Sequence, residues 1–227
     1  MVRFIYSPQW FYGKDIVIDI ISTFVLLLIA FFSLKYYTIK KNHNYMFLAV
    51  SFFILATSFL FKILMNFNIY YKVIETRELG LITVTYQTLK ASNRLFSTTF
   101  LVYWLLTQFG YYSLFSIYQR QSLSNFLFGA YLILVSTFLS YPKYYTFNLT
   151  LFVLLSLITY TYSKNYINRK IFATKLIASS FAVIALSQIF FILVDVNDQL
   201  YVIGELIQLV GYAGLLVAFI MVLRYGR

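Results

Sequence analysis

The chain has 227 residues, of which 61% are hydrophobic and 22% aromatic, while only 11% are charged. A soluble domain is only about half apolar, so the mean hydropathy of +0.78 indicates a polytopic membrane protein. No cysteine is present, which excludes disulfides and thiolate metal sites. We expect the net charge of +11 to reflect orientation and contact with anionic headgroups, and we expect no nucleic-acid partner.

Seven apolar segments are long enough to cross a bilayer as helices. They predict an all-α integral membrane protein, a single domain over residues 1–227, with spans at about 15–37, 45–67, 95–118, 124–141, 144–163, 171–194 and 200–223. Pro142 ends the fourth and shortest span. Only the connection 68–94 is long. Its apolar residues at helical spacing predict an amphipathic surface helix or an extension of the third span.

The distribution of charge predicts the orientation. Counted over short connections, Lys and Arg gather on one side of the membrane and all the acids fall on the other. We therefore expect a multi-pass protein of the cell membrane with its N-terminus outside and its C-terminus in the cytoplasm. The cationic residues of the inner side are Lys35, Lys40, Lys41, Arg120, Lys164, Arg169, Lys170, Lys175, Arg224 and Arg227.

Two parts of the sequence resemble each other, which suggests an internal repeat. Residues 51–68 align without a gap on residues 180–197, and the same register matches basic residues further back along the chain. GYYSL at 110–114 also matches GYAGL at 211–215. The alternatives are chance similarity of apolar sequence and a 3+1+3 plan with parallel copies, in which the fourth span inverts the chain. Matched pairs include Lys35/Lys164, Tyr37/Tyr166, Lys41/Lys170, Ser51/Ser180, Phe52/Phe181, Ala56/Ala185, Ser58/Ser187, Phe61/Phe190, Ile63/Ile192 and Gly110/Gly211.

The last span carries an unusual set of polar residues. Glu205, Gln208 and Tyr212 share one helical face. An ionisable group within a span is expensive and is by default a candidate site. One interpretation is the floor of a polar pocket, and the other is a structural clasp in which Glu205 bonds to Gln188. Small residues that let a neighbouring helix approach closely are expected at Gly204, Gly211, Gly214 and Gly110.

Two further charges lie inside spans. Lys62 and Asp19 fall about one turn from the outer ends of their spans, so a Lys62–Asp19 or a Lys62–Glu205 pair is possible. The alternative for Lys62 is snorkelling to the interface. The outer half of the spans thus collects polar residues while the inner half is nearly pure hydrocarbon, which predicts a water-accessible vestibule open outward. Its expected members are Asp19, Lys62, Arg94, Gln188, Glu205, Gln208 and Tyr212.

Catalytic and metal-binding patterns are missing from the sequence. His43 is the only histidine and lies in a basic connection, without cysteines or acids beside it. No nucleophile–base set, metal-ligand spacing or glycine-rich phosphate loop occurs. We expect no catalytic residues, no metal and no cofactor, and hence no enzyme.

The segment DQLYVIGELIQLVGYAGLLVAFIMVLR, residues 198–224, resembles the last span of seven-helix membrane-associated sensor domains. It resembles still more closely small stand-alone seven-helix proteins of unknown function, of archaeal type. This resemblance covers about 25 residues and otherwise hydropathy alone. The sensor domains usually precede a kinase or cyclase module, which this sequence does not contain, so signalling would need a partner in the cytoplasm or the membrane.

Two other resemblances are limited. The 3+1+3 plan is similar to that of SWEET sugar transporters, but their Pro-Gln helix breaks are missing, since Pro8 and Pro142 are the only prolines. Rhodopsins are similar in number of spans, but the last span has no lysine for a retinal Schiff base. We therefore expect a receptor-like or sensory membrane protein that binds a small ligand or lipid in its outer half. The alternatives are a 3+1+3 small-solute transporter and a structural subunit of a larger assembly.

Overall fold

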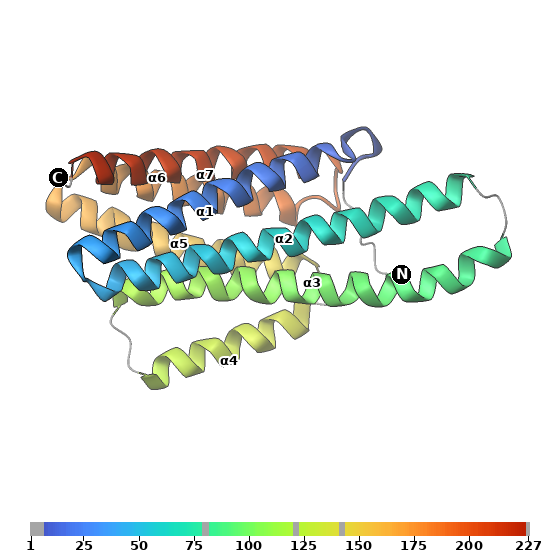
Figure 1. Ribbon diagram of the computed structural model, residues 1–227, viewed down its shortest axis with the longest axis horizontal. Helices are drawn as coiled ribbons and strands as arrows, with labels where there is room; N and C mark the ends of the chain where they lie inside the picture. The colour runs from blue at the N-terminus through green and yellow to red at the C-terminus, as the bar shows by residue number, and fades with distance from the viewer. Residues whose placement is uncertain (1–6, 79–81, 120–122, 141–143, 226–227) are drawn as a thin grey trace.

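The computed structural model describes residues 7–78, 82–119, 123–140 and 144–225, with the side chains of 68–96 and of a few helix ends left out. Within these ranges the chain forms helices and no strand, which confirms the all-α fold class (Figure 1). A 3-10 turn at Gln9–Phe11 precedes α1 (Lys14–Lys40), α2 (His43–Glu78), α3 (Ile82–Gln119), α4 (Leu123–Ser140), α5 (Tyr144–Arg169), α6 (Phe172–Ile192) and α7 (Gln199–Tyr225).

Five of these helices are long and apolar enough to cross a membrane over their described residues: α1, α2, α5, α6 and α7. The apolar stretch of α4 is shorter, at Ser124–Leu139, and α3 has 38 residues, more than a span requires. Large apolar side chains such as Phe24, Phe31 and Phe53 point outward and are exposed. A soluble protein would not cover its surface this way, and the chain is a multi-pass membrane protein.

The helices form a closed bundle with one helix outside it. α2 packs between α1 and α3, and α6 packs between α5 and α7. The contacts α1–α7 and α3–α5 join these two three-helix units, while α4 lies at the periphery against α3 and α5 (Figure 1). The packed pairs of the two units correspond: α1–α2 to α5–α6, α2–α3 to α6–α7, and α1–α7 to α5–α3. The contacts of α4 stand outside this correspondence. This is the arrangement that a 3+1+3 plan requires.

The long connection 68–94 is not a loop lying on the membrane. α2 continues to Glu78 and α3 begins at Ile82, so both helices extend beyond the rest of the bundle as an antiparallel pair (Figure 1). The expectation of an extended third span is therefore met, and the second span is extended as well. The reason lies in the sequence, because no proline or glycine interrupts 67–78 or 82–95. The expectation of a separate surface helix is wrong.

Local geometry repeats at positions that the sequence match pairs. Lys41 and Lys170 are the only described non-glycine residues with positive φ, at 52° and 51°. Their backbone N–H groups donate to the carbonyls of Tyr37 and Tyr166, which form a matched pair themselves. These left-handed residues end α1 and α5 in the same way. A general rotation that superposes α1–α3 on α5–α7 stays a prediction.

Two glycines create matched close approaches between helices. A Cβ added to Gly110 of α3 would meet the side chain of Leu55 on α2, 2.7 Å away. A Cβ added to Gly211 of α7 would meet Ile184 on α6, and it would lie 3.2 Å from backbone atoms of Ile184 and Ser180. Leu55 and Ile184 are matched in the same register. Van der Waals packing across such small residues holds helices together in lipid, where the hydrophobic effect contributes little.

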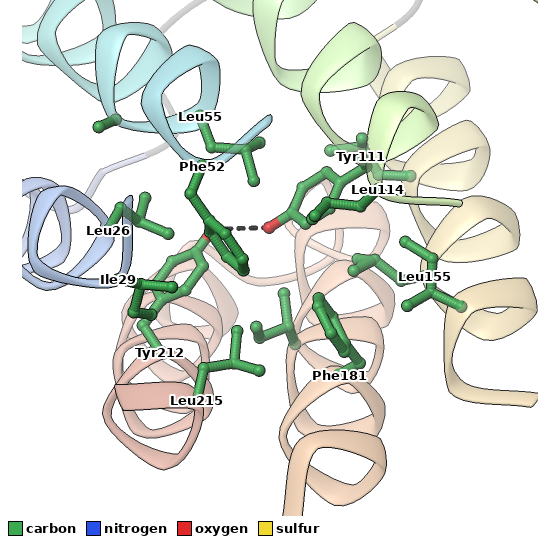
Figure 2. Close-up of a cluster of buried hydrophobic side chains, with 14 of the residues drawn as sticks. Leu26, Ile29, Phe52, Leu55, Tyr111, Leu114, Leu155, Phe181, Tyr212 and Leu215 are labelled. Atoms are coloured by element: carbon green, nitrogen blue, oxygen red, sulfur yellow. Dashed lines mark hydrogen bonds between the residues drawn. The ribbon is translucent and has the colours of Figure 1, made fainter. Parts of the chain in front are cut away.

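The main core lies where the two units meet. Figure 2 shows buried side chains from α1, α2, α3, α5, α6 and α7 converging on it, among them Leu26, Phe52, Leu155 and Phe181. Its centre is the hydrogen bond between the hydroxyls of Tyr111 and Tyr212, 2.7 Å long (Figure 2). Gly204 and Gly214 add contacts to this side of α7, since their faces lie against Phe191 and Ser180 of α6.

The glycine contacts generate a stability prediction. Gly211→Ala should destabilise the purified protein by about 1–3 kcal/mol, because its methyl group would press on the α6 backbone, which cannot move aside. Gly110→Ala should cost less, because its methyl group would meet side-chain atoms of Leu55 and Ile54 and no backbone atom. Ala213→Val, on the exposed face of α7, is the control. Thermal melts in detergent in which Gly211→Ala equals the control would contradict the packing described.

Candidate functional site: a buried charge cluster

Three charged side chains from three helices meet inside the bundle, and we call Asp19, Lys62 and Glu205 the charge cluster. Lys62 Nζ donates to Asp19 Oδ1 at 2.7 Å and to Glu205 Oε1 at 2.6 Å. The side chains of the three residues are 6%, 0% and 1% exposed for Lys62, Asp19 and Glu205. The cluster therefore joins α1, α2 and α7 through one shared ammonium group.

The neighbouring residues hold Lys62 and Asp19 in place. Asn66, one turn further along α2 from Lys62, donates its amide to Asp19 Oδ2 at 3.3 Å. Both carboxylate oxygens of Asp19 thus accept a hydrogen bond. The ammonium also lies over the ring of Phe59, 5.4 Å from its centroid, which adds a cation–π contact. Every one of these contacts restricts Lys62 to the interior.

Burial decides between the two expectations for Lys62. A snorkelling lysine keeps its ammonium in water or among headgroups, whereas this one is enclosed by protein and bonded to two carboxylates. The two pairs considered from sequence are present together. Removing charges from water is costly, and pairing offsets that cost only where geometry and additional hydrogen bonds are good. The cluster meets both conditions on the side of Asp19.

The cluster contains one more carboxylate than ammonium. Asp15, one turn before Asp19 on α1, is also fully buried, and its carboxylate accepts a hydrogen bond from the backbone N–H of Ile16. Two buried carboxylates thus lie one turn apart at this end of α1. In a low-dielectric interior, two carboxylates that share one ammonium favour a further cation or hydrogen-bond donor beside them over an anion.

A second polar chain lies deeper in the bundle. Gln208 Nε2 donates to the hydroxyl of Tyr212 at 3.2 Å, and this hydroxyl in turn pairs with that of Tyr111. The ring of Phe59 packs edge-on against Tyr212, with centroids 5.4 Å apart. Since Phe59 also contacts Lys62, it connects the charge cluster to the tyrosine pair at the centre of the bundle.

The structure corrects two expectations about this region. Glu205 does not form a clasp with Gln188, whose amide instead donates to Ser187 Oγ at 3.1 Å and to the carbonyl of Ile184 at 3.5 Å. A charged ammonium within reach is a better partner for a carboxylate than an amide. The expected open vestibule is also wrong for this conformation, because Asp19, Lys62 and Glu205 are closed off by packing. The side chain of Arg94 lies outside the described residues.

Sequence reasoning missed Asn66 and Tyr111. Both had a signal: Asn66 lies four residues after Lys62, on the same helical face, and Tyr111 is matched to Tyr212 by the repeat. The buried amides of Gln108 and Asn148 were also missed as site residues. Asn148 shows no signal by type alone, because one polar residue in an apolar span is common.

Among the described residues, no group of three or more His, Asp or Glu side chains is placed to hold a metal ion. Comparison with known proteins adds no constraint: no protein-family model, no curated protein and no solved structure matches this chain.

The cluster predicts an order of stability for its variants. Lys62→Met leaves two buried carboxylates without their cation and should cost about 3–5 kcal/mol. Glu205→Gln should cost much less, because Lys62 keeps Asp19 as its partner. The double variant Lys62→Met with Glu205→Gln should recover part of the loss, with a coupling above roughly 1 kcal/mol.

Thermal melts of these variants in detergent make the measurement, and Gln199→Leu, an exposed change at the start of α7, is the control. Strictly additive effects, or a Lys62→Met variant as stable as the control, would mean that the three residues do not share an interaction.

Proposed function

We propose that this protein is a receptor-like or sensory membrane protein, which binds a small ligand or lipid at the charge cluster and signals through a partner. The observation that carries this proposal is the sharing of Lys62 by carboxylates of both three-helix units. Charged residues inside membrane spans are costly and are by default candidate functional sites. A ligand that competes for Lys62 or Glu205 would loosen the contact between α1 and α7.

The other end of the same seam supports a signalling role. There, Tyr36 of α1 donates its hydroxyl to the backbone carbonyl of Val222 on α7, 2.8 Å away. The α1–α7 seam is thus fixed by polar contacts at both ends. Because helices are stiff, a shift of α7 at the cluster is transmitted along its length to the end where the C-terminus lies (Figure 1). A partner docked there would receive the change.

The apolar inner half favours a sensor over a conduit. Between the tyrosine pair and the end of the bundle marked by the C-terminus, the core is filled by residues such as Ile29, Phe52, Leu215 and Ala218, all buried. The buried hydroxyls described in this layer, those of Ser33, Ser51 and Ser180, donate to backbone carbonyls of their own helices, so the described residues offer a solute no continuous polar path. A sensor needs none, since only a conformational change has to cross the membrane.

A transporter is the second candidate, and the exchangeable packing of the two three-helix units favours it, because many transporters place their site between such repeats. Proteoliposomes loaded with labelled small solutes distinguish the two. Uptake above protein-free vesicles that is lost in the double variant Lys62→Met with Glu205→Gln would favour transport over sensing.

Ligand binding is tested by native mass spectrometry of protein exchanged into a total lipid extract of its host membrane. Wild-type protein should retain a bound lipid or small molecule that the double variant Lys62→Met with Glu205→Gln releases, since this variant removes charge but keeps volume. Gln199→Leu should retain it. Identical bound species in all three proteins would contradict a ligand site at the cluster.

Orientation is part of the proposal, with the N-terminus and the cluster outside. The short connection at Asn42 then faces the cytoplasm, together with the cationic residues around it. On intact cells, a membrane-impermeant thiol reagent should label a cysteine placed at Ser7 and should not label one placed at Asn42 or Ser124. The opposite pattern would invert the topology.

A further inference from the structure

Two more buried polar side chains belong to α3 and α5, which pack against each other. Gln108 of α3 is completely buried, and neither its amide oxygen nor its amide nitrogen has a hydrogen-bond partner among the described residues. The same is true of the amide nitrogen of Asn148 on α5, a residue that is 1% exposed. Buried polar groups are nearly always satisfied, so each such group requires an explanation.

Both amides belong to one seam. The ring of Trp104 on α3 stacks on Phe147 of α5, with centroids 4.8 Å apart and an angle of 11° between the planes. Gln108 lies one turn along α3 from Trp104, on the same side of the helix. Asn148 directly follows Phe147. The two amides therefore lie within about one turn of the stacked pair.

This seam occupies the position that corresponds to the charge cluster. Lys35 and Lys164 are matched by the repeat, and Asp19 and Asn148 lie the same number of residues before them. Asn148 therefore corresponds to Asp19. Trp104 and Glu205 likewise lie the same number of residues before the matched glycines Gly110 and Gly211. Trp104 therefore corresponds to Glu205. In the same way, the contact between α1 and α7 corresponds to the contact between α5 and α3.

The third member of the cluster corresponds to an apolar residue. Lys62 lies between Phe61 and Ile63, and Phe191 lies between the matched residues Phe190 and Ile192. Phe191 itself packs elsewhere, with Ile18, Tyr201 and Val202. Where the α1–α7 seam carries two carboxylates and receives an ammonium, the α3–α5 seam thus carries an amide and an indole. The chain has a charged seam and a neutral seam at equivalent places.

We propose that the α3–α5 seam is a second binding site, for a small uncharged molecule that both donates and accepts hydrogen bonds. Water and a small hydroxyl- or amide-bearing solute share this chemistry. The amide oxygen of Gln108 accepts a hydrogen bond, and the amide nitrogens of Gln108 and Asn148 donate. An ion would lack a charged partner among these residues, and charge in such surroundings is expensive.

The aromatic residues limit the ligand further. Phe147 covers one side of Trp104, and Phe100 lies 4.0 Å from it between centroids. Trp104 therefore encloses the site and does not offer a free face to an aromatic ligand. This site is independent of the proposed function, because it uses neither Lys62 nor either carboxylate of the charge cluster.

Trp104 is also the reporter for the test, since the chain has two tryptophans and Trp10 can be replaced by phenylalanine. In lipid nanodiscs, the emission of Trp104 in the Trp10→Phe protein is measured in H₂O and D₂O, and during titration with acetamide or glycerol. A bound water predicts a longer lifetime in D₂O and no saturable response to the solutes. A solute site predicts a saturable shift in emission with acetamide or glycerol.

Either response should be lost when Gln108→Met or Asn148→Leu is added, and should persist with the exposed control Gln199→Leu. Gln108→Met keeps the length of the side chain, so that it folds even where a branched residue does not. The proposal is overturned if the D₂O effect and the titrations are the same with and without these changes. It is also overturned if both variants simply melt at higher temperature with unchanged Trp104 emission, as expected for unpaired amides with no bound molecule.

Discussion

A buried ammonium group in a membrane protein must be compensated by groups that the fold brings to it, and Lys62 is compensated from two directions. Asp19 approaches from α1 and Glu205 from α7, so the lysine of α2 connects the first and last helices of the chain. Helix association in lipid has little hydrophobic driving force. Under these conditions a shared ion pair and close packing at small residues determine which helices are neighbours, and the closure of the bundle depends on both.

The rest of the architecture is consistent with two similar units joined by that contact and by the tyrosine pair. Tyr111 and Tyr212 come from matched segments of α3 and α7 and bond to each other at the centre. The glycines that precede them each receive a side chain of the neighbouring helix, Leu55 in one unit and Ile184 in the other. At these tyrosines and glycines the two units have similar packing. Their polar residues differ, because the α1–α7 seam carries charges and the α3–α5 seam carries amides and aromatic rings.

The helical membrane fold was predictable from the sequence, because membrane spans are recognised by their length and hydropathy. The face shared by Glu205, Gln208 and Tyr212 followed from helical periodicity, and the pairing of Lys62 with either carboxylate was one of two alternatives. What could not be decided was whether Lys62 turns inward or toward the interface, because a long flexible side chain permits both. Only the position of α1 and α7 around it resolves this. The Glu205–Gln188 clasp failed for the same reason, since sequence gives the residues on a helical face but not the rotation of a neighbouring helix.

The central claim is that Lys62 is held between two carboxylates inside the bundle. Solid-state NMR on protein in lipid bilayers, with ¹⁵N at lysine side chains and ¹³C at Asp and Glu carboxylates, measures this contact directly. The Lys62 Nζ signal, assigned by its loss in Lys62→Met, should be dephased by two carboxylate carbons, one missing in Asp19→Asn and the other in Glu205→Gln. A Lys62 signal that is dephased by neither carbon, and that exchanges freely with water, would place the ammonium at the interface and contradict the account.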